Sequence, residues 1–425
     1  MKKFFIFLAA VVLSCGLLSC SSDDDDPDTV KKVVDMLADP EPIQLTDAQK
    51  QFANDNNTFT LNFLKTVNET DRSGKSFIYS PLSITYVLGM VNAASTGETE
   101  KELEQTLGFH EGGIQAVNDY CKKLIEGLPK VDRKVKLSIA NALFVNKNKA
   151  TLKSEYQKDM QTYYNAEVKN LDFNSSSTLK TINGWAQEKT NNMIPTILDR
   201  IDPDVVTYLL NAIYFKANWN KKFDPNNTKT ETFTTPNGTK QLPLMHQNVL
   251  INYMKNETYS SVLIPYDNSY WSIMVYLPEK GKTADDIINT FNPSNDIKAM
   301  SPCQVDLKLP RFETNSDTQN MKDGLIGLLE KMGIRRVFDS ELAEIPNMCN
   351  TSVFISMMRQ KAGIKVNEEG TETAVVTLGS GYASWAGPGG YEILKADFHA
   401  NCPFVYVIRE RSSNVILSVG KYTGM

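Results

Sequence analysis

Histidine is scarce in this sequence, and the motifs of several enzyme classes are missing. The 425-residue chain contains only His110, His246 and His399. It has no Gly-x-Ser-x-Gly elbow, no His-Glu-x-x-His and no phosphate-binding glycine loop ending in Lys-Ser or Lys-Thr. The glycine run at 387–390 lacks the strand and helix that flank a nucleotide loop. We therefore expect a protein that is not an enzyme, in which His399 is a packing or loop residue rather than a general base.

Closely spaced cysteines are also absent. Of the six, Cys15 lies in an N-terminal apolar run and Cys20 directly follows it. The other four lack close pairing and metal-ligand spacing: Cys121, Cys303, Cys349 and Cys402. No metal or cofactor is expected from this pattern. It leaves open whether the four form disulfides or remain buried free thiols.

The chain has no basic cluster. Its formal net charge is −5, and residues 20–41 alone carry eight acidic and two basic side chains. The rest of the chain is therefore close to neutral. A near-neutral body without a basic patch gives no electrostatic footing for nucleic acid.

The N-terminus has the pattern of an export signal. Two lysines precede an apolar run over residues 4–18, which is too short to span a membrane as a helix. We interpret residues 1–19 as a signal peptide. The run ends in Leu-Leu-Ser-Cys, which resembles the lipobox of bacterial lipoproteins and implies lipid on Cys20 and a membrane anchor. The alternative is that Cys20 belongs to an ordinary signal sequence.

An acidic stretch follows Cys20. Residues 21–28 read Ser-Ser-Asp-Asp-Asp-Asp-Pro-Asp, a composition typical of disordered, self-repelling chain. We predict a flexible tether over residues 20–44. Similar acidic runs in bacterial surface lipoproteins direct the protein to the outer face of the outer membrane, so the resemblance implies cell-surface or extracellular display. A plain solvated spacer is the alternative.

Residues 45–425 show no linker and no internal repeat, so we predict one large domain. Apolar periodicity and capping signals predict helices over residues 47–67, 81–94, 99–107, 114–128 and 321–332. Ser80 is the expected cap of the second helix, and Thr99 with Glu102 the expected capping box of the third. Strands are predicted over 136–145, 205–215, 249–254, 259–265, 271–277, 305–309 and 353–366, with a final hairpin of 404–409 and 415–419. This mixture is an α+β fold with helices first and sheets later.

One segment near the C-terminus has no charged residue, although 22% of the whole chain is charged. It runs from Thr373 to Tyr391. Its first part is rich in Thr, Ala and Val, which favour strands, and its second part is rich in Gly, Ser, Ala and Pro, which favour an exposed loop. Gly370, just before it, is a natural pivot. Because exposed uncharged strand-forming segments are an aggregation hazard, we expect this loop to become a strand in the protein's own sheet.

Four motifs, in order along the chain, resemble those of one family. They are Ser-Pro-Leu-Ser-Ile at 80–84, Asn-Ala-Ile-Tyr-Phe-Lys-Ala-Asn-Trp at 211–219, Asn-Glu-Glu-Gly-Thr-Glu at 367–372, and Phe-His-Ala-Asn-Cys-Pro-Phe at 398–404 followed by Val-Tyr-Val-Ile-Arg. Together they resemble serpin signatures over residues 45–422. The resemblance implies a large central mixed sheet, smaller sheets and an exposed reactive loop at about 368–395. We expect a monomer.

The resemblance also implies candidate site residues. The positions that match the hinge of the loop are Glu368, Glu369, Gly370, Thr371, Thr373, Val375 and Thr377. The positions that match the polar cluster beneath the central sheet are Ser80, Ser83, Asn211 and Gln360. Trp219 matches the bulky residue at the top of the opening, where Glu368 and Arg311 match a surface ion pair worth ~0–1 kcal/mol. Serpins usually carry His at the position of Gln360, so no imidazole is expected to titrate there.

In the family, the bond cut by the protease follows the seventeenth residue of a count that begins at the hinge acid. With Glu368 as the first residue, the resemblance places this bond between Ser384 and Trp385. The stretch after it is longer than is usual in the family, so Tyr382 and Ala383 are alternatives. Ala or Ser before the bond suits an elastase-like pocket and Tyr a chymotrypsin-like one, whereas the absence of Lys and Arg disfavours trypsin-like targets.

The implied function is suicide inhibition of serine proteases. The target protease attacks the loop and becomes covalently attached to it as an acyl-enzyme, and insertion of the loop then traps the protease. The alternative is a non-inhibitory serpin fold that serves as a surface binding module.

Overall fold

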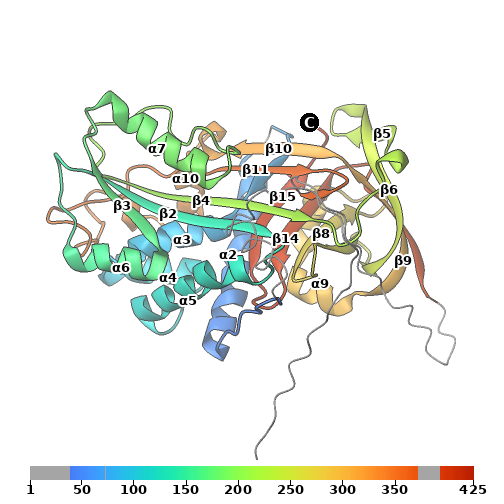
Figure 1. The fold of residues 1–425 in the computed structure, drawn as a ribbon, viewed down its shortest axis with the longest axis horizontal. Helices are drawn as coiled ribbons and strands as arrows, with labels where there is room; N and C mark the ends of the chain where they lie inside the picture. Colours follow the sequence, from blue (N-terminus) through green and yellow to red (C-terminus); the bar gives the residue numbers. More distant parts are fainter. Residues whose placement is uncertain (1–38, 72, 372–392) are drawn as a thin grey trace, which may run out of the picture. The chain divides into compact units, whose positions relative to one another are not determined.

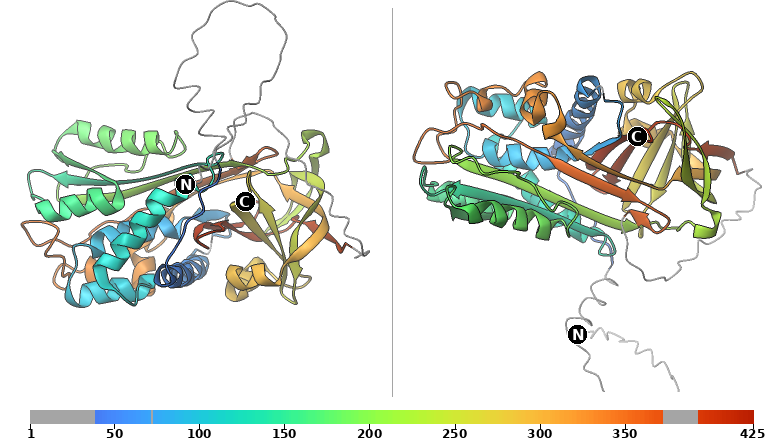
Figure 2. Two further views of the ribbon diagram at one scale, coloured as in Figure 1. Left: turned by 60° about the horizontal axis from the view of Figure 1, so that its bottom comes forward. Right: turned by 90° about the horizontal axis from the view of Figure 1, so that it is seen from above.

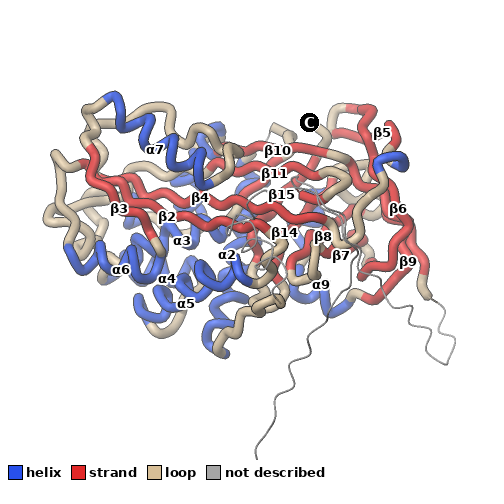
Figure 3. Tube along the Cα trace, viewed as in Figure 1, coloured by secondary structure: helices blue, strands red, loops and turns tan. Residues whose placement is uncertain are grey.

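The computed structural model describes residues 39–71, 73–371 and 393–425. The described residues belong to one compact unit, Asp39–Met425, built from helices and two β-sheets, which confirms the predicted α+β class (Figure 1, Figure 3). Among the described residues, no helix combines the length and the apolar character needed to cross a bilayer. The predicted signal peptide, Cys20 and most of the tether lie outside the described residues.

The end of the predicted tether is part of the folded body. Ile43 is buried, and its backbone N–H donates a hydrogen bond of 2.9 Å to the Ser412 hydroxyl. Glu41 forms an ion pair with Arg133. The tether prediction was therefore too long, because these few residues supply an apolar anchor and a charge partner that the acidic composition upstream does not suggest.

The first part of the body is helical, as predicted. It contains α2 (Asp47–Thr70), β1 (Phe77–Tyr79), α3 (Pro81–Asn92), α4 (Gly97–Leu107) and α5 (Gly113–Gly127). The predicted capping box of α4 is wrong, since the helix begins two residues earlier and places Thr99 inside its first turn. The Thr99 hydroxyl instead accepts the Glu344 N–H at 3.1 Å, and the Glu102 carboxylate accepts the Arg336 N–H at 2.8 Å.

A six-stranded sheet forms the centre of the body. Its strand order is β10 (Phe312–Asp317), β11 (Lys361–Val366), β12 (Gly370–Thr371), β4 (Thr207–Asn218), β2 (Lys136–Asn146) and β3 (Ala166–Leu171). The sheet is mixed, because β2 and β3 are parallel whereas the other neighbours are antiparallel. The long register between β2 and β4, from Lys136 opposite Lys216 to Val145 opposite Thr207, makes this pair its rigid part.

Helices cover both faces of this sheet (Figure 2). On one face, α7 (Ser176–Lys189) packs Ile182 and Trp185 against Phe144 and Tyr208. On the other face lie α3 and α6 (Ser154–Tyr164), in the larger core cluster. Strand alternation explains the two cores, since successive side chains of a strand point to opposite faces. In β4, every second residue of most of the strand is accordingly only partly buried.

The second sheet has nine strands. Along its main path the order is β1, β15 (Ile416–Tyr422), β14 (Phe404–Glu410), β8 (Trp271–Pro278), β7 (Tyr259–Pro265), β6 (Gly238–Lys255), β9 (Ser301–Pro310) and β13 (Lys395–His399), and β5 (Lys229–Thr235) pairs with β6. Short helices α8 (Ala284–Thr290), α9 (Pro293–Ala299) and α10 (Gly324–Lys331) join or flank these strands. β14, buried at every position, is the centre of this core. The predicted C-terminal hairpin is confirmed as β14 and β15.

Candidate functional site: the opening between β4 and β11

The hinge segment has already entered the central sheet. Thr371 pairs with Val366 of β11 on one side and with Ala217 of β4 on the other, and Gly370 pairs with Asn218. In the described part of the chain, β4 and β11 are not paired with each other anywhere. Among the residues that the structure describes, Gly370 and Thr371 are the part of a third strand that lies between β11 and β4.

A cavity occupies the space where these strands are apart. Its volume is about 50 Å³, and its lining comes from both strands and from the segment beneath them. The lining includes Ser80, Ser83, Asn211, Phe215, Gln360 and Thr371. Four residues of the predicted polar cluster thus surround one opening, which begins where the hinge strand stops.

Gly370 fits at the top of the opening because it has no side chain. Its φ is +157°, and a Cβ atom there would lie 2.1 Å from the Ala217 carbonyl oxygen and 2.6 Å from the Cα of Asn218. The turn that delivers it is fixed by Asn367, whose side-chain oxygen accepts the N–H groups of Glu369 at 3.0 Å and of Gly370 at 3.2 Å. The pivot that the sequence predicts here is thus a point of close backbone approach.

Aromatic rings support the hinge from below. Thr371 is buried, and its hydroxyl lies 2.7 Å from the Tyr266 hydroxyl. Tyr266 stacks on Trp219 with ring centroids 4.8 Å apart and an interplanar angle of 10°. The Trp219 indole N–H donates to the Asn367 carbonyl at 2.8 Å. Trp219 therefore lies at the top of the opening, where the resemblance placed it, and Tyr266 was missed because only the fold brings its loop there.

The expected ion pair between Glu368 and Arg311 is present. The Arg311 Nε–H donates to Glu368 at 3.1 Å and a second guanidinium N–H bonds the other carboxylate oxygen. The Glu368 side chain is only 8% exposed, against 49% for Arg311, so the expected surface pair is buried on its acidic side. Burial acts to raise the pKa of Glu368, but hydrogen bonds from Arg311 and from the Thr228 hydroxyl outweigh burial and hold this pKa below its usual range.

Gln360 and Ser80 form a closed pair at the lower side of the opening. The Ser80 N–H donates to the Gln360 side-chain oxygen at 3.1 Å, and the Gln360 amide donates to the Ser80 carbonyl at 2.8 Å. Ser80 occupies the predicted N-cap position of α3, but its hydroxyl donates to the Leu417 carbonyl at 2.6 Å and makes no capping bond to the helix. The amide of Gln360 thus uses both its donor and its acceptor.

A second series of polar side chains, linked by hydrogen bonds, crosses the sheet beside the pair of Gln360 and Ser80. Ser83 of α3 hydrogen-bonds Asn211 of β4, whose amide donates to Asn141 of β2 at 2.8 Å. Asn141 in turn donates to the Tyr164 carbonyl at 2.6 Å. Asn141 was missed by sequence reasoning, although two asparagines in adjacent apolar strands were a usable signal. The two sets of hydrogen bonds thus attach β4 and the start of β11 to different partners and form no bond between these two strands.

A half-buried carboxyl beside the top of β4, that of Asp267, was also missed. The Asp267 carboxylate accepts the Asn218 N–H at 3.1 Å. Burial raises the pKa of Asp267 to about 6, partly offset by that hydrogen bond and reinforced by the nearby Asp132. Asp132 is itself held by Asn268, whose N–H donates to it at 3.0 Å. Asp267 thus binds the residue of β4 that pairs with Gly370 of the hinge.

Some predicted site residues lie outside the described residues. They are the hinge positions Thr373, Val375 and Thr377, the residues around the expected cut Tyr382, Ala383, Ser384 and Trp385, and the lipidation candidate Cys20. The four cysteines whose state the sequence left open are described, and all are free thiols: Cys121, Cys303, Cys349 and Cys402. Burial raises the pKa of Cys349 and of Cys402 to about 11, which makes them poor nucleophiles.

Comparison with known proteins decides what this sheet belongs to. The family model described as "Serpin (serine protease inhibitor)" matches residues 54–424. The chain belongs to the serpin family. Human neuroserpin is 28% identical over 364 residues, which cover 82% of this chain and 85% of neuroserpin. Human serpin B11 is 30% identical over 396 residues, which cover 85% of this chain and 96% of that protein.

Solved serpin structures share the fold. The thermophilic serpin tengpin in its native state superposes with a TM-score of 0.77 at 24% identity, covering 92% of this chain and 99% of tengpin. Thyroxine-binding globulin in complex with thyroxine gives a TM-score of 0.74 at 25% identity, covering 88% of this chain and 98% of that chain. The predicted family and fold are thereby confirmed, and serpins in general inhibit serine proteases.

Proposed function

We propose that this serpin is a suicide-substrate inhibitor of elastase-like or chymotrypsin-like serine proteases. The observation that carries the proposal is the two-residue strand β12, which enters between β11 and β4 and leaves the rest of the opening without strand pairing among the described residues. Strand addition by loop insertion is the established mechanism of inhibitory serpins. Within the described ranges, neither β4 nor β11 has a strand partner along the rest of the edge that would receive the loop.

The lengths are compatible with insertion. The positions of β4 below Ala217 run from Thr207 to Lys216, about 33 Å of strand. Cleavage after Ser384 would leave thirteen residues beyond Thr371, about 43 Å when extended. A loop cut at Ser384, or at the alternatives Tyr382 and Ala383, is therefore long enough to pair along the remaining length of β4.

The chemistry is that of an interrupted hydrolysis. The protease serine hydroxyl attacks the carbonyl carbon of Ser384, an ester forms, and the Trp385 nitrogen leaves as an amine after taking up a proton. Water would normally cleave that ester. Insertion of the freed segment gains main-chain hydrogen bonds and carries the attached protease with it, which distorts its active site before hydrolysis.

Replacement of Thr371 by Arg tests this mechanism. The Thr371 side chain is buried against Tyr266, so an arginine there would place a charge without a partner in the path of insertion. We expect the natural chain to form an SDS-stable complex with pancreatic elastase or chymotrypsin, and Thr371→Arg to be cleaved without forming one. Mass spectrometry of the released C-terminal fragment identifies the bond.

Thr239→Arg is the matched control, since it adds the same charge at an exposed position of β6 and should leave complex formation unchanged. An undiminished yield of complex from Thr371→Arg would contradict the insertion mechanism. Failure of the natural chain to form any complex with either protease would overturn the proposed function itself.

A non-inhibitory binding module is the second candidate. It is favoured by the likeness to thyroxine-binding globulin, a serpin whose structure contains a small ligand, and by Thr373 and Val375, which are larger than the Ala typical of strong inhibitors. Thermal unfolding separates the two. An inhibitor should melt markedly higher after its loop is cut, because the inserted form is lower in free energy, whereas a binding module should melt at the same temperature.

We also propose that residues 1–19 are removed and that lipid on Cys20 anchors the protein to the outer membrane, facing the cell exterior. The support is the sequence pattern: a lipobox-like end of the apolar run, then an acidic stretch. Incorporation of radiolabelled palmitate into the natural chain and its loss in Cys20→Ala would support the anchor, and equal labelling would exclude it.

A further inference from the structure

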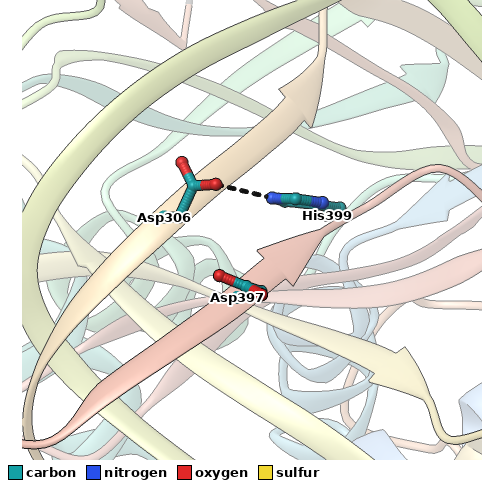
Figure 4. Close-up of side chains that lie close together, drawn as sticks. All are labelled: Asp306, Asp397 and His399. Atoms are coloured by element: carbon teal, nitrogen blue, oxygen red, sulfur yellow. Dashed lines mark hydrogen bonds and ion pairs between the residues drawn. The ribbon is translucent and has the colours of Figure 1, made fainter.

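Four potential metal ligands face the same side of three neighbouring strands in the second sheet. His246 lies on β6. Asp306 lies on β9, and Asp397 and His399 lie on the edge strand β13 (Figure 4). The register brings them together, since Asp397 pairs with Asp306, and both histidines pair with Lys308, two residues further along β9. Residues two apart on a strand share a face, so all four side chains project from one side of the sheet.

The three side chains drawn in Figure 4 have the spacing of a metal site. The His399 Nε2 lies 3.0 Å from one carboxylate oxygen of Asp306, and one ligand atom from each of Asp306, Asp397 and His399 lies within 4.8 Å of the others. A zinc ion bound at about 2.0–2.2 Å in a tetrahedral site needs its ligand atoms about 3.4 Å apart. Small side-chain movements would therefore close the three ligands around one ion.

Neighbouring side chains orient one of these ligands and leave another without a partner. His246 hydrogen-bonds the second carboxylate oxygen of Asp306 and so fixes the orientation of this ligand. Lys308, the cation on the same face, is occupied by Glu231, with both carboxylate oxygens at 2.8 Å. Within the described residues, the exposed Asp397 carboxylate has no hydrogen-bond or ion-pair partner. A cation between Asp306 and Asp397 would relieve the repulsion of two neighbouring carboxylates.

We propose that Asp306, Asp397 and His399 bind one Zn²⁺ ion, with His246 as a positioning residue, and that the ion fastens β13 to β9. One imidazole and two carboxylates are a ligand set that suits zinc, while Mg²⁺ and Ca²⁺ prefer oxygen ligands alone. The sequence predicted no metal because the ligands are separated by up to 93 residues, between Asp306 and His399, and have no motif spacing.

Fastening β13 would matter for the loop, a consequence that rests on the proposed function. β13 is an edge strand of five residues that pairs only with β9 among the described strands. An uncut loop can insert further only if chain is released from its far end, and each residue of β13 that detaches supplies about 3.3 Å. Bound zinc should therefore slow the spontaneous loss of inhibitory activity of the uncut protein.

Calorimetric titration of the full, metal-free chain with Zn²⁺ tests the site. We expect one ion per chain, roughly tenfold or more weaker binding in Asp397→Asn and in His399→Ala, and a comparable loss in His246→Gln through misorientation of Asp306. His110→Ala is the matched control, because His110 is exposed and outside the cluster, and Mg²⁺ is the control ion. A rise in melting temperature with zinc that both ligand variants lose provides a second readout.

Absence of zinc binding, or equal affinity in the natural chain and in His399→Ala, would overturn the site. Zinc binding that leaves the rate of activity loss unchanged would overturn the fastening of β13. If the chain proved to inhibit no protease, the titration would still decide the site, because binding is measured without a target enzyme.

Discussion

Gly370→Ala perturbs the hinge by the smallest possible addition. The new methyl group would lie 2.1 Å from the Ala217 carbonyl oxygen, whereas ordinary contacts of this kind require about 3.4 Å, so one strand must move by more than 1 Å. β4 cannot easily move, because its long register with β2 and the bond between Asn218 and Asp267 hold it. We therefore expect β12 to leave its place between β11 and β4.

The cost follows from what β12 would lose. Three strand pairings, two with β4 and one with β11, and the hydrogen bond between Thr371 and Tyr266 would break. At about 1 kcal/mol net for each, the loss is about 3–4 kcal/mol. Because 1.4 kcal/mol corresponds to a factor of ten, the same clash in the path of insertion would slow insertion by roughly a hundredfold. Hydrolysis of the acyl-enzyme would then win.

Two assays measure these effects: the melting temperature of the intact protein and the number of inhibitor molecules consumed per protease trapped. Gly370→Ala should lower the melting temperature by several degrees and should strongly raise the number of inhibitor molecules consumed per protease trapped. Gly281→Ala is the matched control, since Gly281 also has positive φ (+81°) but nothing within 4 Å of the added methyl group. If Gly370→Ala melted like the natural chain and trapped protease with unchanged stoichiometry, the close approach to β4 would have no role in the hinge.

Two further predictions concern the groups that flank the opening. A carboxyl whose pKa is raised in the folded protein destabilises the fold once it is ionised. The contribution of protonated Asp267 to the free energy of unfolding should therefore be present at low pH and be lost as pH rises through about 6. Between about pH 5 and 7.5 the free energy of unfolding should fall by about 1 kcal/mol after allowance for partial exposure, because part of the loss already occurs between the unfolded pKa and pH 5, and the melting temperature should fall with it. Asp267→Asn should flatten that slope, and a profile parallel to that of the natural chain would contradict the prediction. Gln360→Leu should cost about 1–3 kcal/mol because it leaves the buried N–H of Ser80 without a partner, whereas the Ser80 carbonyl keeps the hydrogen bond from the Ser83 N–H at 3.0 Å. Gln360→His, which can still donate and accept, should restore most of that loss in chemical denaturation, and no difference between the two variants would argue against the pair.

Much of the scaffold could be predicted from the sequence because its strands are strongly apolar and bounded by turn residues. β7 matches its predicted range and β2 and β8 extend theirs by one residue, whereas β6 extends well beyond its predicted core because its outer part is polar and exposed. α7 was missed although Leu179, Ile182 and Ala186 have helical spacing, since its other positions are polar. Local patterns thus predicted the elements with a strong apolar signal and missed α7, most of whose positions are polar.

The candidate site divides in the same way. Trp219 and the ion pair of Glu368 with Arg311 lie where the family motifs placed them. Asn141 and Tyr266 carry no such motif and reach the opening only through strand register and the stacking of a loop. The zinc ligands are a similar case, because pairing between distant strands brings them together. Contacts of this kind depend on the fold and have no periodicity that a single sequence could reveal.

The two attachments of the loop explain how one cut could change the sheet. At its start, Thr371 is held between β11 and β4, and at its end the Leu394 carbonyl accepts the Gln304 N–H at 2.8 Å and the Cys303 thiol at 3.1 Å. In the intact chain each residue that enters the opening must be supplied against this second attachment. Cleavage between the two removes that constraint without altering any contact at the hinge. In the proposed mechanism, strand pairing along the opening below Thr371 supplies the driving force, and the proposed fastening of β13 decides whether that force acts before a protease arrives or only after the cut.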